Sequence, residues 1–186
     1  MSPAVAGDRK RKKVVVGIAD MAVSGDPSDI LVTYALGSCL GICIYDAEAG
    51  VAGLLHAMLP SAKVNPEKGR SNPARFIDTG VPVLFRAAYA LGAAKERIIV
   101  RVAGGASMSS GSGTDGFQIG RRNYVEFKKI LWRNGVILRD HDVGGRVSRT
   151  ISMDVSTGDV QVKAGSRTYP LSRRVPRSPE PPRMER

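Results

Sequence analysis

Two apolar runs separated by a short polar turn constrain this chain most. The runs are Cys39–Tyr45 and Val51–Met58, and the stretch 46–50 between them (Asp-Ala-Glu-Ala-Gly) is turn-forming sequence. We therefore predict a β-hairpin. A turn centred in the middle of that stretch places Cys39 directly opposite His56 on the neighbouring strand. If the loop is longer, the two residues are offset from direct opposition by one position. Opposed side chains of such a pair have Cβ atoms about 5 Å apart, so a thiol and an imidazole there can exchange a proton.

The rest of the chain alternates strands with two helices. We expect one helix within Ala74–Leu91, where Pro82 either kinks it or lies near its start, and one at Gly120–Asn134, where apolar residues recur at helical spacing. Further strands are predicted at Lys13–Met21, Ile30–Tyr34, Arg97–Val102, Val136–Asp140, Arg149–Val155 and Val160–Lys163. Polar loops are predicted at Ser61–Pro73 and Ser107–Gly116. This pattern indicates an α+β or layered α/β domain.

The positive charge of the chain is concentrated at its two ends. Of a net charge of +11, residues 1–13 and residues 167–186 carry +4 each, and residues 14–166 carry +3. At 186 residues a single domain is expected. We predict a flexible basic segment at 1–13, the folded domain at 14–165, and a disordered basic tail rich in Pro and Arg at 166–186.

Composition and apolar run lengths limit the partners and the compartment. A basic nucleic-acid-binding module rests on charge alone, and no nucleic acid is expected because aromatic residues are only 5% of the chain and do not interleave with a basic stripe. No apolar run reaches the roughly 18 residues of a membrane helix, so no membrane insertion is expected. The run 14–19 is too short for a signal peptide. Two cysteines without such a signal predict a cytoplasmic protein.

Scarce reactive residues gather in one region of the sequence. The chain has two cysteines and two histidines; Cys39 follows a Gly-Ser turn, His56 follows 17 residues later, and Thr33 precedes Cys39 by six. A thiol, an imidazole and a residue that orients the imidazole are the parts of a covalent acyl-transfer enzyme. Cys43 lies four residues along the same strand, about 13 Å away, which is too far for a disulfide or a shared zinc ion. We assign Cys43 to the core and His141 to the surface, and we expect no metal and no cofactor.

Each member of this group also has a plain structural interpretation. A lone free cysteine such as Cys39 is most often a small core residue, and a lone histidine such as His56 is most often a hydrogen-bonded core residue. Thr33 alone is an ordinary strand residue. The Gly-Ser turn and the hairpin register, taken together, favour the active site.

Five segments resemble the bacterial chemoreceptor glutamine deamidase family, CheD. They are Leu-Gly-Ser-Cys-Leu-Gly at 36–41, His-Ala-Met-Leu-Pro at 56–60, Gly-Gly-Ala-Ser-Met at 104–108, Ile-Gly-Arg-Arg-Asn at 119–123, and Asp-Val-Gly-Gly-Arg at 142–146 continuing to Arg-Thr at 149–150. The resemblance covers residues 14–163. Ser148 departs from it, since the family usually has glycine there, and the basic ends have no counterpart.

The resemblance implies a single-domain, layered α-β-β-α sandwich. It also implies that selected glutamines of methyl-accepting chemotaxis receptors are hydrolysed to glutamate, with Cys39, His56 and Thr33 as the catalytic residues, and that a CheC-type phosphatase is a partner. The alternative is a regulator of the same fold that binds receptors or the phosphatase without catalysis.

An oxyanion site completes the expected chemistry. Acyl transfer passes through a negatively charged oxygen, which backbone N–H groups hold. We expect these groups at Ser38–Cys39 or in the glycine loop at Gly104 and Gly105.

Overall fold

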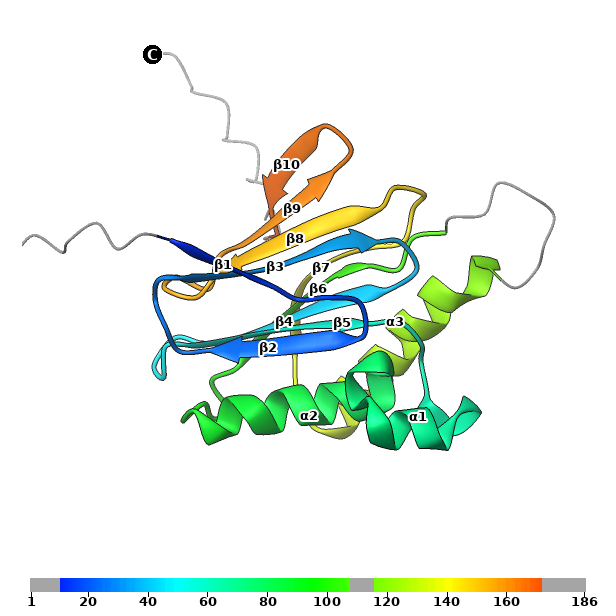
Figure 1. Ribbon diagram of the computed structural model, residues 1–186, viewed down its shortest axis with the longest axis horizontal. Coiled ribbons are helices and arrows are strands. Elements are labelled where there is room, and N and C mark those ends of the chain that lie inside the picture. The colour runs from blue at the N-terminus through cyan, green and yellow to red at the C-terminus, as the bar shows by residue number, and fades with distance from the viewer. Residues whose placement is uncertain (1–10, 108–115, 172–186) are drawn as a thin grey trace, which may run out of the picture.

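The computed structural model describes residues 11–107 and 116–171, and in them ten strands form two five-stranded sheets (Figure 1). The outer sheet has the order β1-β3-β8-β9-β10. Its strands are β1 (Lys12–Val15), β3 (Asp29–Leu36), β8 (Arg149–Asp154), β9 (Val160–Ala164) and β10 (Arg167–Pro170). The central sheet has the order β2-β5-β4-β6-β7. Its strands are β2 (Asp20–Ser24), β5 (Val51–Ala57), β4 (Leu40–Asp46), β6 (Ile99–Gly104) and β7 (Leu138–Val143).

The helices lie together on one side of the central sheet (Figure 1). They are α1 (Pro66–Ser71), α2 (Ile77–Ala90) and α3 (Gly116–Arg133), with 3₁₀ turns at Ala62–Val64 and Pro73–Arg75. Helix α2 continues through Pro82 and buries the apolar stripe Ile77, Val81, Leu84, Phe85 and Ala88. This spacing is that of an amphipathic helix with one face on the core.

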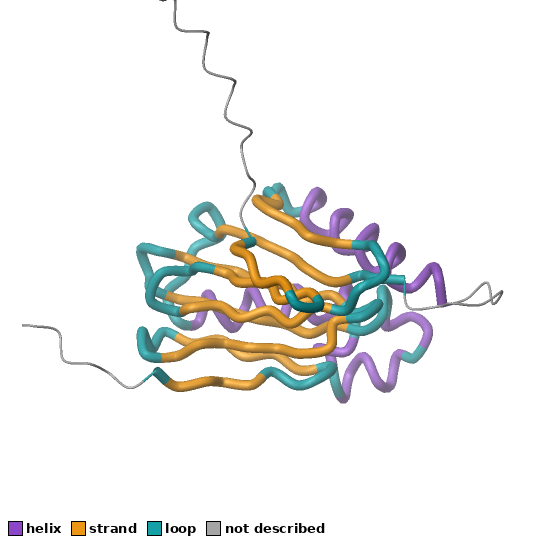
Figure 2. Tube along the Cα trace, turned by 90° about the horizontal axis from the view of Figure 1, so that it is seen from above, coloured by secondary structure: helices purple, strands orange, loops and turns teal. Residues whose placement is uncertain are grey.

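Two apolar clusters hold the three layers together. Strand alternation divides β4 between them, because Leu40, Ile42 and Ile44 face the helices and Cys43 and Tyr45 face the outer sheet. One cluster therefore fills the space between the helices and the central sheet, and the other fills the space between the two sheets. In Figure 2, seen from above, the strands lie in front of the helices.

The predicted mixed α/β, single-domain class with two sheets is confirmed, but the order of layers differs from the expected α-β-β-α sandwich. The described helices all pack on the central sheet, and none of them covers the far face of the outer sheet. The reason lies in the alternation of β8, where Ile151 and Met153 are buried and Ser152 and Asp154 are partly exposed. A sheet face of this polarity can face water and needs no covering layer.

The predicted hairpin forms, but its register was predicted wrongly. Strands β4 and β5 are antiparallel, with Gly41 opposite His56 and Leu40 opposite Ala57, so Cys39 lies two positions away from direct opposition to His56. An offset of two residues preserves the face of the sheet. Cys39 and His56 are therefore diagonal neighbours, about 7–8 Å apart at the backbone, which is within reach of an aromatic ring.

Asp46 explains the register. Its side chain accepts hydrogen bonds from the N–H groups of Glu48 (3.0 Å) and Ala49 (3.2 Å), so the turn closes one residue later than predicted. The same carboxylate accepts from Ala94 N–H and pairs with Arg97 at 2.8 Å. Burial opposes ionisation of Asp46, but these hydrogen bonds and the Arg97 charge outweigh it and lower the pKa to about 2.

Two other predicted segments have a different secondary structure from the one expected. The single strand predicted at Lys13–Met21 is wrong, because β1 and β2 belong to different sheets and the chain turns between them at Ala19, which has φ +57°. The predicted loop Ser61–Pro73 contains α1. Asn65 accepts the N–H of Lys68 at 2.9 Å, and Pro66 occupies the first turn. Asparagine followed by proline is a helix-start signal. The other predicted strands and both predicted helices overlap the observed ones.

The predicted domain boundaries were placed too far inward. Lys12 and Lys13 lie in β1, paired with β3, and Arg167–Pro170 forms β10, paired with β9. A strand strongly charged at its edge is common in natural sheets. Residues 1–10, 108–115 and 172–186 lie outside the described residues, so the predictions for them stay predictions. No helix in the described part of the chain is long and apolar enough to cross a membrane.

Candidate active site

His56 and Thr33 meet between the two sheets. His56 lies on β5, Thr33 lies on β3, and both are fully buried. The Thr33 hydroxyl lies 2.7 Å from the carbonyl oxygen of Val16 and 2.7 Å from Nδ1 of His56. A hydroxyl has one proton, and a carbonyl can only accept. Thr33 therefore donates to Val16 and accepts from Nδ1–H.

This arrangement determines the tautomer of His56. Because Nδ1 carries the proton, Nε2 has a free lone pair. Nε2 is buried and has no hydrogen-bond partner in the described residues. An oriented, unpartnered imidazole nitrogen is the form that a general base requires.

Burial shapes the electrostatics of the candidate pair. Burial lowers the pKa of His56 and raises the pKa of the Cys39 thiol, the latter partly offset by the backbone N–H of Cys39 itself. Both shifts disfavour charge, as expected for groups removed from water. Burial therefore favours the neutral thiol and the neutral imidazole.

The turn that carries Cys39 is irregular. The register between β3 and β8 shifts between Thr33 and Leu36, and Ala35 has φ +57°. The N–H of Gly37 donates to the carbonyl of Ala35 at 2.9 Å. Cys39 then packs, partly exposed, against the cluster between the sheets. The tight turn lets Thr33 and Cys39 approach the same side of β5.

The glycine loop holds this turn from the other side. The N–H of Gly105 donates to the Cys39 carbonyl at 2.8 Å, so it is not available to an oxyanion, which corrects its expected role. At Gly104, φ is +120° and a Cβ atom would lie 2.2 Å from the Cys39 carbonyl oxygen. Only glycine fits there, since real Cβ atoms do not approach so closely. The two glycines therefore shape the turn.

The other oxyanion candidates include the amides of Ser38 and Cys39, and the role expected of Gly104 stays a prediction. Within the part of the chain that the structure describes, neither N–H donates to another residue's backbone or side chain. The Cys39 N–H lies close enough to its own sulfur to lower the thiol pKa. Free amides beside the sulfur are the donors that acyl transfer needs.

Sequence reasoning assigned no role to Asn123, which contacts both halves of the site. Asn123 lies on α3, is fully buried, and donates through Nδ2 to the carbonyls of Ser38 (3.0 Å) and Met58 (2.9 Å). A signal was present: Asn123 precedes Phe127 by four residues, so a polar amide occupies the buried stripe of the helix. A polar residue at a core position requires hydrogen-bond partners.

Cys43 and His141 lie where they were predicted, in the core and at the surface. Cys43 is buried and unpaired, and burial raises its pKa to about 12, so its thiol is inert at neutral pH. His141 is exposed, with its ring 5.9 Å from that of Tyr124. Among the described residues, no three His, Cys, Asp or Glu side chains gather as a metal site would require.

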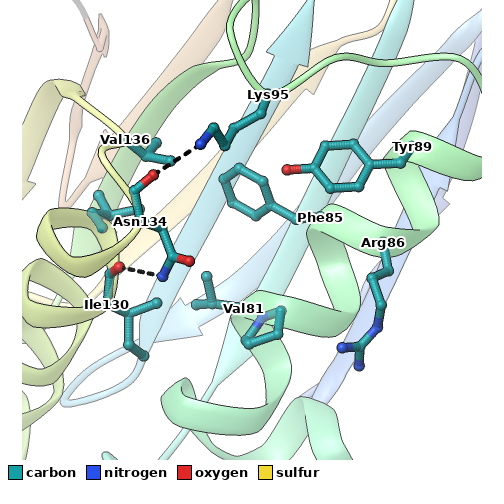
Figure 3. Close-up of a pocket in the computed structure, with 10 residues that line it drawn as sticks. Val81, Phe85, Arg86, Tyr89, Lys95, Ile130, Asn134 and Val136 are labelled. Atoms are coloured by element: carbon teal, nitrogen blue, oxygen red, sulfur yellow. Dashed lines mark hydrogen bonds between the residues drawn. The ribbon is translucent and has the colours of Figure 1, made fainter.

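A cavity of about 200 Å³ lies away from this site, between α2 and α3. Figure 3 shows Val81, Phe85 and Tyr89 of α2 facing Ile130 and Asn134 of the α3 side. The lining includes neither Cys39, His56 nor Thr33. The cavity is therefore a feature of the helical layer, and the candidate chemistry lies on the opposite face of the central sheet.

Comparisons with known proteins agree with the resemblance in the sequence. Residues 58–164 match the model of the family CheD, chemotactic sensory transduction. "Probable chemoreceptor glutamine deamidase CheD 1" of Syntrophus aciditrophicus is 46% identical over 151 residues, 81% of this chain and 93% of that protein. "Probable chemoreceptor glutamine deamidase CheD" of Solibacter usitatus is 41% identical over 91% of this chain and 97% of that protein. The protein of the same name from Pyrococcus abyssi is 43% identical over 82% and 91%.

These matches are long and cover nearly the whole length of each relative. The family model begins after Thr33, Cys39 and His56, so the geometry of those residues is an observation independent of that match. By the family match and the relatives together, the chain belongs to the CheD family.

Proposed function

We propose that this protein is a cytoplasmic protein-glutamine deamidase that hydrolyses glutamine side chains of methyl-accepting chemotaxis receptors to glutamate. The names of its relatives supply the substrate class. The observation that carries the proposal is the Thr33 hydroxyl, which accepts from Nδ1–H of His56 and so leaves Nε2 free as a base beside the Cys39 turn.

The first half of the reaction forms a thioester. Nε2 of His56 takes the thiol proton as the sulfur of Cys39 attacks the amide carbon of the glutamine. The amides of Ser38 and Cys39 hold the oxyanion, and one such donor contributes about 3–4 kcal/mol. The imidazolium then gives its proton to the leaving nitrogen, the C–N bond breaks, and ammonia departs.

The second half restores the enzyme. His56 takes a proton from water as the water attacks the thioester, and the proton returns to the sulfur of Cys39 as glutamate forms. A positioned base of this kind contributes roughly 100- to 10,000-fold in rate. Thr33 accepts from Nδ1–H throughout. As a neutral group it stabilises the imidazolium less than a carboxylate would.

The product is a change in receptor charge. Each glutamine that becomes glutamate adds one negative charge and one carboxylate that a methyltransferase can use. A CheC-type phosphatase is the partner implied by the resemblance, and it stays a prediction.

The test uses a receptor cytoplasmic fragment incubated with wild type, Cys39→Ala or Cys43→Ala protein. We expect ammonia release and the mass increase of amide-to-acid conversion with wild type and Cys43→Ala, and neither with Cys39→Ala. A chelator should leave wild-type activity unchanged. Wild-type protein that binds the fragment without changing its mass would support the alternative, a regulator that acts by binding. An active Cys39→Ala protein would exclude the thioester mechanism.

A further inference from the structure

We infer that Asn123 is a positioning residue that fixes the Cys39 turn against the His56 strand. Its Nδ2 group donates one hydrogen bond to the Ser38 carbonyl and one to the Met58 carbonyl. Ser38 directly precedes the nucleophile, and Met58 follows the base by two residues. The inference rests on the proposed Cys39–His56 chemistry and names the residue that sets its geometry.

The backbone alone does not connect the two segments. The β4–β5 ladder ends at Leu40 opposite Ala57, just before the Cys39 position is reached. The next N–H along β5, that of Met58, donates instead to the carbonyl of Arg75 at 2.9 Å. Strand β5 therefore leaves the hairpin at the point where the thiol and the imidazole must be held together. The Asn123 amide spans this gap and takes the place of the missing ladder bond.

The orientation of the amide follows from its partners. Both partners are carbonyl oxygens, which only accept, so the NH₂ group of Asn123 must face them. Its Oδ1 atom is buried and has no hydrogen-bond partner in the described residues. A buried oxygen without a partner is costly. The amide thus keeps its orientation through the two N–H bonds, which connect Ser38 to Met58.

Helix α3 is held close enough for this contact by a glycine one turn earlier. A Cβ atom at Gly120 would lie 2.5 Å from the carbonyl oxygen of Gly105. Gly105 in turn donates to the Cys39 carbonyl. Residues three apart share a helix face, so Gly120 and Asn123 contact the Cys39 turn from the same side. The helix therefore positions the nucleophile at two points.

The first test compares turnover in Asn123 variants. Asn123→Asp has nearly the same shape but presents oxygens to the two carbonyls, and Asn123→Ala removes the side chain. Because a displacement of about 1 Å costs roughly 100-fold, we expect kcat for ammonia release to fall about 100-fold in both while KM stays within about threefold. Asn123→Ser keeps one donor and adds no volume, so its kcat should fall less than that of Asn123→Ala. It replaces the other two variants in this test if they do not fold.

The second test needs no receptor. Alkylation of Cys39 by chloroacetamide requires the thiolate, which His56 generates near neutral pH and which forms without help in alkali. The rate at about pH 7 divided by the rate at about pH 10 therefore reports the thiol–imidazole contact. We expect His56→Ala to lower this ratio, and Asn123→Asp and Asn123→Ala to lower it toward the His56→Ala value. Inert Cys43 should stay unlabelled throughout.

Phe127→Leu is the matched control, since Phe127 is equally buried on the same helix but has no donor group for either carbonyl. It should lower the melting temperature and leave kcat and the alkylation ratio near those of wild type. If Asn123→Ala melts near Phe127→Leu and retains the wild-type kcat and alkylation ratio, the inference is wrong. It is equally wrong if Phe127→Leu lowers the ratio as much. The wild-type protein could also fail to deamidate any receptor while the Asn123 variants still lower the alkylation ratio. That result would support the positioning role of Asn123 and reject the proposed receptor substrate.

Discussion

At the scale of single residues, the site consists of groups without charge. Thr33 has already donated its only proton to Val16, so His56 can only donate to it through Nδ1. Burial lowers the pKa of the imidazole and raises the pKa of the Cys39 thiol, so it favours the neutral form of both. The hydrogen bond from His56 to Thr33 therefore orients the base without a charged partner.

Substitution of Thr33 separates a hydrogen-bonding role from a packing role. Thr33→Val keeps the shape but leaves Val16 O and His56 Nδ1–H unpaired, which costs about 1–3 kcal/mol for a buried group. We expect Thr33→Val to lose most ammonia release and Thr33→Ser to retain most of it, with His56→Ala worse than either. A Thr33→Val enzyme with full turnover would show that the residue only fills space.

The pH dependence of stability reports the buried imidazole. Above the ordinary pKa of 6.5, His56 is neutral in both the folded and the unfolded chain. Below it the unfolded chain binds a proton that the folded chain refuses, since burial lowers the folded pKa. The free energy of unfolding should therefore fall as pH decreases from about 6.5, by up to about 1.4 kcal/mol per pH unit.

Urea unfolding of wild type and His56→Asn at about pH 7.5, 6.5 and 5.5 measures this contribution. The variant should show a shallower decline over the same interval. Equal slopes in the two proteins would mean that His56 accepts a proton in the folded state as readily as in the unfolded chain.

Sequence reasoning singled out Cys39 and His56 because they are rare and lie in specific motifs, and Thr33 because the family resemblance implies a threonine there. It could not identify the acceptor at Val16, because that contact uses a backbone carbonyl, which every residue has. It missed the buried Asn123 for a different reason. The helix was judged by its apolar spacing, and the polar residue within the stripe was not followed to its partners.

At the scale of elements, local signals were reliable and long-range pairing was not. The hairpin was predicted from its turn, yet its register was off by two because Asp46 bonds the amides of Glu48 and Ala49 and closes the turn late. Strand β1 was predicted only as part of one long strand, and its parallel pairing with β3 was not predicted; β10 was missed because its residues were assigned to the basic tail.

The packing of α3 on the glycine loop gives a prediction at this scale. Gly120→Ala places a Cβ atom 2.5 Å from the Gly105 carbonyl oxygen, and backbone on both sides leaves little room to adjust. Overpacking of this kind costs about 1–3 kcal/mol. Gly25→Ala is the control, because its nearest neighbour lies 3.9 Å away.

The melting temperature and the rate of ammonia release should both fall in Gly120→Ala and stay near the wild-type values in Gly25→Ala. Loss of activity beyond the loss of stability is expected, since the strain reaches Cys39 through Gly105. If Gly120→Ala melts and turns over like wild type, α3 does not hold the turn.

At the scale of the whole molecule, one domain separates a helix-facing core from a core between the sheets. The candidate site belongs to the second core, and the two most basic ends of the chain contribute none of its residues. The candidate catalytic residues and the most basic segments therefore lie in different parts of the sequence.

A shortened chain tests this separation. Protein spanning residues 11–171 keeps the ten described strands and lacks half of the terminal charge, +4 of +8. We expect it to melt within a few degrees of the full chain and to release ammonia from receptor at a comparable rate. The full chain could bind nucleic acid and the shortened chain could lose that binding while it still deamidates the receptor. That result would assign nucleic-acid binding to the ends. Loss of deamidation would place a requirement for turnover in the removed residues.

In the proposed mechanism, the hydrogen bond from Thr33 to Val16 makes the first strand a condition for activity. Val16 directly follows β1, a short edge strand held by β3. When this end frays, the Thr33 hydroxyl loses its acceptor and becomes free to donate to Nδ1 of His56. The ring then moves its proton to Nε2 and can no longer accept one from Cys39. Turnover should therefore decline with rising temperature before global unfolding begins, because local opening at the N-terminal edge converts the base into its inactive tautomer.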